Sequence, residues 1–407
     1  MWIEKFDNPQ KEVFQILNEK QEVNPDYADY LKKFDAKILL QAYQWMTLSR
    51  LQEKMQLEMN YAKDDKGQPI LINGQPKVMG KVINFLGSSG QEATEVGYAI
   101  NIRKGIDWLV PAYRNNAAWI TAGYPIEKII QYWLGNEMGS QIPKGINILP
   151  VNIPIGTQYS HAAGIALAEK YKKGKGVIFT TIGDGGTSEG EFFEAMNFAA
   201  LHKLPIVFFI ENNQWSLDTP TTKATMSPTF AQKGTAVGIP NIRVDGNDFF
   251  SVYHVTNTAI ERAKNHQGPS LIEAVTYRQL SHSAFDIKKD YFTEEDFKNE
   301  QEWFKKDPII RMKTYLEKNK LWDEAKEKEL VSANTKKINE AIAWAQKNSA
   351  VPIDEIFDYT YEKLTPKLAE QKAEAKSYFT TSDNLISEMQ KPTIEAKSYF
   401  GDREEAK

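Results

Sequence analysis

One segment of the chain predicts a strand, a helix and a second strand in direct succession. Residues 177–182 and 206–210 are short apolar runs rich in β-branched and aromatic residues, as in strands that are buried on both faces. Between these runs, Ser188 and Glu191 have the spacing of a capping box, and an apolar stripe typical of a helix follows. This order predicts a βαβ unit with two parallel strands.

Polar residues follow both predicted strands. Asp184 comes at the end of the first strand, and Asn213 comes directly after the second. Because parallel strands end at the same edge of a sheet, where open α/β folds bind ligands, we expect both side chains to face one ligand. A carboxylate, an amide oxygen and a backbone carbonyl suit Mg²⁺, which completes its shell with phosphate and water. Gly183, Gly185 and Gly186 allow close backbone approach, so the sequence predicts a magnesium diphosphate site.

Alone, Gly-Asp-Gly is more often an ordinary turn than a metal site, because short motifs recur by chance. Here it is paired with Asn212-Asn213 across one βαβ unit, and the pair resembles the thiamine diphosphate motif of thiamine-dependent enzymes. Flanking segments narrow the resemblance to the α subunits of 2-oxoacid dehydrogenase E1 components, with the pyruvate dehydrogenase branch most similar. These segments are GSSGQEA at 87–93, PAYR at 111–114, SEG at 188–190, Phe193-Glu194, Asn197, Tyr277-Arg278 and SHS at 281–283, within a resemblance that spans 36–321.

The resemblance implies an α/β fold with a doubly wound, mostly parallel sheet flanked by helices, and an α2β2 heterotetramer that requires thiamine diphosphate and Mg²⁺. Such an enzyme decarboxylates a 2-oxoacid and passes the acyl group to a lipoyl domain of the E2 core. The E2 lipoyl and subunit-binding domains are therefore expected partners. Pyruvate is the expected substrate, and the branched-chain 2-oxoacid and acetoin dehydrogenase complexes are the alternatives.

The resemblance also assigns the residues of the site. The expected metal ligands are Asp184, Asn213 and Trp215, and the expected cofactor contacts are Tyr113, Arg114, Ile155, Gly183, Asp184, Gly185, Gly186, Asn213, Arg278 and His282. Ile155 matches the apolar wedge that holds the cofactor bent, although an isoleucine there also suits the core. Arg114 offers the bidentate geometry that phosphate favours, although most arginines simply lie at the surface.

Of the five histidines, His282 is the candidate catalytic residue, because its segment resembles the loop at the family's active-site mouth. A histidine with a pKa near neutrality can orient or protonate the acyl intermediate and the incoming lipoyl group. The segment departs from the family pattern where an arginine is usual, and Lys288 or Lys289 is the candidate replacement. Ser283 matches a serine that is phosphorylated in some members.

One catalytic group is expected to come from another chain. In the family, the β subunit supplies the glutamate that activates the aminopyrimidine of the cofactor. Glu211 lies beside Asn212 in the metal-binding half of the motif, so we set it aside for this role. The chain alone is therefore expected to be inactive.

The remaining sequence predicts appendages around one large domain. We expect an N-terminal arm at 1–35 that packs on a partner, a thiamine diphosphate-binding domain at 36–322, and a helical C-terminal segment and tail at 323–407. Further expected elements are helices at 36–60, 249–264 and 323–348, a hairpin between 61 and 82, strands at 242–244 and 271–277, and a short element at 351–364. The tail repeats EAKSYF at 374–379 and 395–400, which suits a solvated tail or a docking peptide rather than a solenoid.

Composition excludes several other classes. The formal charge of −4 gives no electrostatic case for nucleic acid, and the absence of cysteine excludes disulfides and thiolate catalysis. No apolar stretch is long enough to span a bilayer, and the start lacks a signal-type pattern, so we expect a cytoplasmic protein without a membrane partner. A transketolase-like half subunit should lack the Tyr-Arg and Ser-His-Ser segments, whereas a non-catalytic phosphate-binding or assembly protein would tolerate loss of His282.

Overall fold

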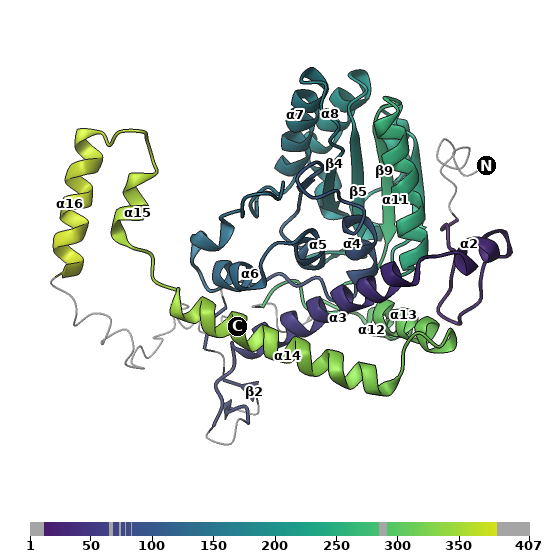
Figure 1. Cartoon of the computed structure of the whole chain (residues 1–407), viewed down its shortest axis with the longest axis horizontal. Helices are drawn as coiled ribbons and strands as arrows, with labels where there is room; N and C mark the ends of the chain where they lie inside the picture. The colour runs from purple at the N-terminus through teal and green to yellow at the C-terminus, as the bar shows by residue number, and fades with distance from the viewer. Residues whose placement is uncertain are drawn as a thin grey trace, which may run out of the picture. The chain divides into compact units, whose positions relative to one another are not determined.

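The computed structural model describes residues 12–64, 68–72, 75–77, 79–82, 84–284 and 291–380. These residues divide into two compact units, one that ends at Ser349 and one that begins at Ala350. The first unit is built around a sheet of five parallel strands in the order β3-β4-β5-β9-β8 (Figure 1). The strands are β3 (Trp108–Val110), β4 (Ile178–Gly183), β5 (Ile206–Asn212), β8 (Asn241–Asp245) and β9 (Ser270–Val275).

Each face of this sheet is covered by its own apolar core. Successive side chains of a strand point to opposite faces, so Phe179 and Phe209 enter one core while Ile178 and Phe208 enter the other. The first core contains α3 (Ala36–Glu58), α4 (Glu92–Ala99), α5 (Asn116–Ala122), α6 (Ile126–Trp133) and α11 (Phe249–Lys264), and the second contains α7 (Thr157–Tyr171) and α8 (Gly190–Leu201). This arrangement confirms the predicted doubly wound α/β fold.

The predicted βαβ unit is present as β4, α8 and β5. The two strands pair in parallel from Ile178 opposite Ile206 to Gly183 opposite Glu211. The predicted capping box is wrong. The chain after Asp184 forms a 3-10 helix, η3 (Gly185–Ser188), so Ser188 closes that turn, and Glu189 takes the N-cap position of α8 without a side-chain capping bond.

The described part of the N-terminal arm packs on its own chain. The N–H of Phe14 donates to the carbonyl of Arg243 at 2.9 Å, and the N–H of Asp245 donates to the carbonyl of Phe14 at 3.0 Å. These bonds continue the sheet beyond β8 by one isolated parallel bridge. We expected this arm to pack on a partner, but residues 12–24 and the short helices η1 (Pro25–Tyr27) and α2 (Ala28–Lys32) lie within the first unit.

The predicted hairpin between residues 61 and 82 is also present. Strands β1 (Leu71–Ile72) and β2 (Gln75–Pro76) pair antiparallel, while the expected turn residues Asn73 and Gly74 lie outside the described residues. The other elements of the first unit are η2 (Glu137–Ser140), β6 (Trp215–Ser216), β7 (Thr219–Pro220), α9 (Thr221–Ala224), α10 (Gln232–Thr235), α12 (Glu294–Phe304), α13 (Pro308–Lys318) and α14 (Glu324–Lys347).

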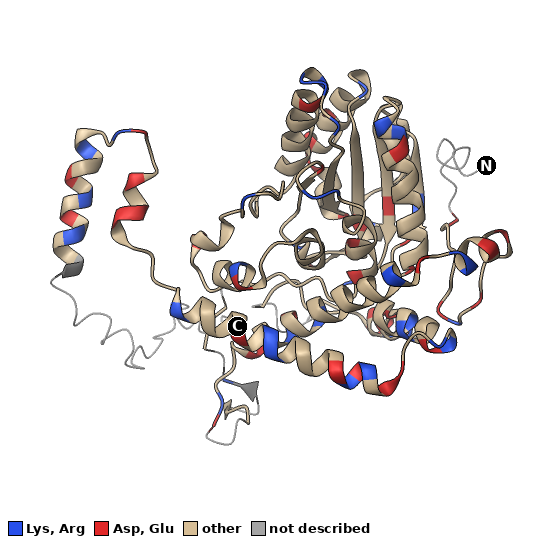
Figure 2. Cartoon of the chain, viewed as in Figure 1, with Lys and Arg blue, Asp and Glu red and all other residues tan. Residues whose placement is uncertain are grey.

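Two C-terminal regions have different surroundings. Helix α14, which confirms the predicted helix at 323–348, packs against α3 and α6, and its charges of both signs are interspersed along the exposed side (Figure 2). The second unit contains α15 (Ile353–Asp358) and α16 (Pro366–Thr380), which Lys372 joins by an ion pair with Asp354 at 2.6 Å. The first EAKSYF copy lies in α16, and the second lies outside the described residues. Within the described ranges, the helices are too short or too polar to cross a membrane.

Candidate active site

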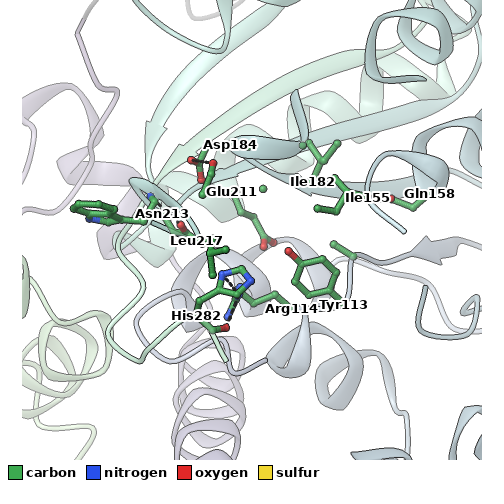
Figure 3. Close-up of a pocket in the computed structure, with 16 residues that line it drawn as sticks. Tyr113, Arg114, Ile155, Gln158, Ile182, Asp184, Glu211, Asn213, Leu217 and His282 are labelled. Atoms are coloured by element: carbon green, nitrogen blue, oxygen red, sulfur yellow. Dashed lines mark hydrogen bonds between the residues drawn. The ribbon is translucent and has the colours of Figure 1, made fainter. Parts of the chain in front are cut away.

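A cavity of about 320 Å³ lies where β4 and β5 end (Figure 3). Because Gly183 pairs beside Glu211, the next residues at the two strand ends bring Asp184 and Asn213 to the same edge. The cavity is lined by Ala112, Tyr113, Arg114, Ile155, Gln158, Ile182, Gly183, Asp184, Gly185, Gly186, Glu211, Asn213, Trp215, Ser216, Leu217 and His282. The structure therefore brings every predicted site residue except Arg278 to the lining of one cavity.

Asp184 is a buried carboxylate on the floor of this cavity. It is 1% exposed, and Ser216 donates a hydrogen bond from Oγ to its Oδ2 at 3.1 Å. Burial raises the pKa of Asp184 to about 6, although the Ser216 hydroxyl and the positive charge of Arg278 act in the opposite direction. A cation bound beside this carboxylate would stabilise its charged form and offset the cost of burial.

Glycines allow neighbouring side chains to pack closely on the turn after Asp184. A Cβ on Gly185 would lie 2.2 Å from Ser216 Oγ, and a Cβ on Gly186 would lie 2.8 Å from Ile155 Cγ2. Ile155 is 46% exposed although it lies at the cavity, between the sheet edge and the start of α7. A large apolar side chain exposed at the cavity wall suits the predicted wedge beneath a bent cofactor.

Arg114 and His282 form the opposite wall (Figure 3). The Arg114 guanidinium donates from Nη1 to the carbonyl of Gly87 at 2.8 Å and from Nη2 to the carbonyl of His282 at 2.9 Å. Nη2 also lies 3.3 Å from His282 Nδ1. Tyr113 lines the same wall, with its ring centroid 5.7 Å from the Arg114 guanidinium carbon.

The electrostatics of His282 differ from the expectation of a pKa near neutrality. Burial and the positive charges of Arg114 and Arg278 lower the pKa of His282 to about 3, so the imidazole is neutral at pH 7. A guanidinium has only donors, so Nδ1 accepts from Arg114, and the ring proton therefore lies on Nε2. The wall thus holds a neutral imidazole in a defined tautomer.

Other predicted residues lie around this wall. Arg278 is buried behind the cavity and donates to the carbonyl of Leu217 at 3.3 Å, so in this structure it acts on Asp184 and His282 by its charge. Trp215 lines the cavity and stacks on Phe292, with ring centroids 4.4 Å apart. Ser283 is buried. The loop residues 285–290, with the candidate replacements Lys288 and Lys289, lie outside the described residues.

Sequence reasoning missed several residues of the cavity. Gln158 lines it and donates to the carbonyl of Thr181 at 2.9 Å, and Leu217 borders it between Trp215 and Arg278. Glu211, which we set aside, also lines the cavity and is buried. Burial raises the pKa of Glu211 above its usual range, against the effect of hydrogen bonds from Asn115 and Tyr98. The position of Glu211 next to Asn212 and Asn213 could have indicated that it lies at the site.

The fold and the cavity together define an α/β protein with a ligand site at the carboxyl edge of a parallel sheet. A family model described as "Dehydrogenase E1 component" matches residues 77–353, and the chain belongs to this family of thiamine diphosphate-dependent enzymes. This finding confirms the family to which the sequence motifs pointed.

Named relatives agree with the family. The chain is 44% identical over 301 residues to the pyruvate dehydrogenase E1 component subunit alpha of Acholeplasma laidlawii, covering 74% of this chain and 86% of the relative. It is 40% identical over 341 residues to the protein of the same name from Mycoplasma genitalium, covering 84% and 89%. A third such protein, from Staphylococcus aureus, is 39% identical over 293 residues, covering 72% and 78%.

Proposed function

We propose that this chain is the α subunit of a pyruvate dehydrogenase E1 component. With a β subunit, it decarboxylates pyruvate oxidatively and acetylates the lipoyl domain of an E2 protein. The observation that carries the proposal is the meeting of Asp184 and Asn213 at adjacent strand ends, in one cavity with the exposed Ile155. The names of the similar proteins support pyruvate over the branched-chain and acetoin alternatives.

The cavity floor fits Mg²⁺ and a diphosphate. The Asp184 carboxylate, the Asn213 amide oxygen and the Trp215 carbonyl are hard oxygen donors, which Mg²⁺ prefers. Within the described ranges, no group of three or more His, Cys, Asp and Glu side chains is placed to hold a metal. A cation on this floor would therefore draw its other ligands from the diphosphate and water.

Thiamine diphosphate, when bound, supplies the carbanion stabilisation that lets a 2-oxoacid lose its carboxylate. The chain itself contributes binding and orientation. Asp184 and Asn213 would hold the metal, Ile155 would support the cofactor with its apolar side chain, and Tyr113 and Arg114 would offer donors to phosphate. At the mouth, His282 presents its Nε2–H as a hydrogen-bond donor to the substrate or the lipoyl group.

Partnership with a β subunit is part of this proposal. The cofactor's aminopyrimidine requires a glutamate, and Glu211 is engaged elsewhere because its oxygens accept hydrogen bonds from Asn115 at 2.9 Å and Tyr98 at 3.3 Å. We therefore expect the purified chain alone to show no turnover, and activity to appear when the β subunit is added in a 1:1 ratio. Full turnover by the isolated chain would contradict the assignment as an α subunit.

A substrate panel on the chain co-purified with its β subunit tests the proposed reaction. Reduction of an artificial acceptor and acetylation of a lipoyl domain should be fastest with pyruvate and should require both thiamine diphosphate and Mg²⁺. A preference for branched-chain 2-oxoacids or acetoin would reassign the substrate within the family. Absence of turnover with every substrate, despite a bound β subunit and cofactor, would indicate a non-catalytic protein.

A further inference from the structure

A series of buried hydrogen bonds leads from the backbone beneath the cavity to the Asn213 side chain. It begins at the backbone N–H of Ala112, which can only act as a donor. This N–H donates to Asn115 Oδ1 at 2.7 Å. The Thr181 hydroxyl donates to the same oxygen. Because Asn115 Oδ1 is fixed as an acceptor, its Nδ2 must face Glu211, and it lies 2.9 Å from both carboxylate oxygens.

Glu211 in turn determines which end of the Gln91 amide faces it. Among the residues that the structure describes, the hydrogen-bond partners of Glu211 Oε2 are Asn115 Nδ2 at 2.9 Å and Gln91 Nε2 at 3.3 Å, which are both donors. If Glu211 carries a proton, the proton lies on Oε1, where the Tyr98 hydroxyl at 3.3 Å can accept it. Oε2 is therefore an acceptor in either charge state, and the amide nitrogen of Gln91 always faces Glu211.

The orientation of Gln91 then determines that of Asn213. With its nitrogen turned to Glu211, Gln91 directs Oε1 to the other side, where Asn213 Nδ2 donates to it at 2.8 Å. Asn213 must then keep its Oδ1 away from Gln91, and the N–H of Trp215 donates to that oxygen at 3.3 Å. Gln91, Glu211 and Asn213 are all buried, so water does not compete with these bonds.

We propose that Gln91 is a positioning residue, oriented by Glu211, that keeps the oxygen of the Asn213 amide toward the bound cation. The two ends of an asparagine amide are almost identical in shape, yet only the oxygen can bind Mg²⁺. An amide turned by 180° would present NH₂ to the cation and repel it. The inference rests on the proposed function, because it concerns the cation that this function requires.

A near-isosteric substitution tests this positioning role. Gln91→Met keeps the volume but removes the bonds to Glu211 and Asn213, so Gln91 no longer orients the Asn213 amide. The Mg²⁺ concentration for half-saturation should rise about tenfold or more, the scale known for groups that orient metal ligands. A role in packing alone would leave it nearly unchanged. Glu211→Gln should stay close to the parental value, because its NH₂ can take the place of Oε1 and donate to the Tyr98 hydroxyl, which leaves an acceptor facing Gln91.

An exchange of the two side chains should preserve the site. In the double variant Gln91→Glu with Glu211→Gln, position 91 carries a carboxylate, which accepts from the amide at position 211 and also from Asn213 Nδ2. The double variant should therefore stay within about threefold of the parental Mg²⁺ requirement, since the Asn213 oxygen still faces the cation. The single change Gln91→Glu should not be neutral, because it places two carboxylates side by side.

The measurement is binding of thiamine diphosphate at increasing Mg²⁺, by calorimetry and without substrate, on the chain co-purified with its β subunit. The matched control is Gln131→Met in α6, where a buried glutamine loses its bond to the carbonyl of Asn348 far from the cavity. That variant should retain the parental Mg²⁺ requirement.

Failure of the inference and failure of the proposed function give different results. If the parental protein binds the cofactor equally well without Mg²⁺, or if Asp184→Ala leaves cofactor binding unchanged, the inference and the proposed function are both overturned. If Mg²⁺ and Asp184 are required but Gln91→Met keeps the parental requirement, or the double variant needs as much Mg²⁺ as Gln91→Met, the positioning role alone is overturned. If Gln91→Met does not fold, a double variant that needs about tenfold more Mg²⁺ than the parental protein overturns it.

Discussion

The floor and the wall of the cavity are held in place by different means. On the floor, Asp184 and Asn213 follow the ends of two paired central strands and are 1% and 5% exposed. On the wall, His282 is only partly buried, and Arg114 secures it by contacts between loops that are distant in sequence. The register of the sheet positions the floor, whereas contacts between loops, those of the Arg114 guanidinium among them, position the wall.

Because of this difference, we expect cofactor binding and the rate of the reaction to depend on different parts of the site. The floor carries oxygen donors for a cation, and its geometry follows from the register of β4 and β5. The wall carries a neutral imidazole whose tautomer depends on the Arg114 contact. Substitutions on the floor should therefore weaken cofactor binding. On the wall, loss of His282 should leave binding largely intact and slow the reaction, whereas a change of Arg114, which also offers donors to phosphate, should affect both.

The largest effect is expected for Asp184→Ala on the floor. Removing the charged metal ligand leaves the diphosphate poorly compensated, so affinity for thiamine diphosphate in excess Mg²⁺ should fall by more than about 100-fold, beyond the loss typical of outer-shell changes. Asn213→Ala should cause a smaller loss. Calorimetry measures both, with Ser216→Ala as a control that removes the neighbouring donor but keeps the carboxylate. Parental affinity in Asp184→Ala would contradict the metal assignment.

The second effect concerns chemistry on the wall. His282→Asn should keep cofactor affinity within a few-fold and lower acetyl transfer to a lipoyl domain by about 100-fold, the usual scale for a positioned proton donor or acceptor. His266→Asn, the same change at an exposed histidine distant from the cavity, is the control. Parental transfer rates in His282→Asn would make this histidine structural and would remove the distinction between floor and wall.

Arg114→Lys should have an intermediate effect. Lysine keeps the charge but lacks the planar fork, so one ammonium cannot reproduce the bonds to both Gly87 and His282. We expect kcat to fall about tenfold with a smaller change in cofactor affinity, because the histidine loses its fixed orientation. Steady-state kinetics and calorimetry on one preparation separate the two quantities. If Arg114→Lys weakens cofactor binding as strongly as Asp184→Ala, the wall belongs to the binding machinery and the comparison fails.

The floor was predictable from sequence, and physical reasons explain why. Buried strands give continuous apolar runs, and parallel strands end at one edge, so the positions of Asp184 and Asn213 follow from local pattern and a general rule. The family resemblance added the wall residues Arg114 and His282. It did not reveal that Arg114 itself bonds to the His282 segment or that it lowers the pKa of the histidine.

Contacts between distant segments could not be predicted. The series from Gln91 to Glu211 and the bridge from Phe14 to Val244 join segments separated by long stretches of chain, and such bonds leave no periodicity in either segment. The contact of the N-terminal arm with β8 was therefore not predicted, and packing of the arm on a partner stays a prediction. The capping-box error at Ser188 has a similar origin, because spacing alone does not show that a 3-10 turn precedes the helix.

The smallest expected effect is on the pH dependence of stability, and it tests whether the wall keeps His282 neutral. The pKa of His282 is about 3 in the folded chain, against about 6.5 for an unperturbed histidine. Between these values the unfolded chain binds one more proton at this position than the folded chain does. This difference favours unfolding, so stability is highest above about pH 6.5 and declines as the pH falls toward 3.

His282→Asn removes this proton uptake, so it should lose less stability between pH 7.5 and pH 5 than the parental protein does. Urea midpoints of the same preparation at the two pH values measure the difference, with His266→Asn as the control for loss of a histidine as such. Equal pH-dependent losses in His282→Asn and the parental protein would mean that the imidazole can take up a proton in the folded state. The wall would then be open to water, and its geometry would depend on the ligand rather than on Arg114.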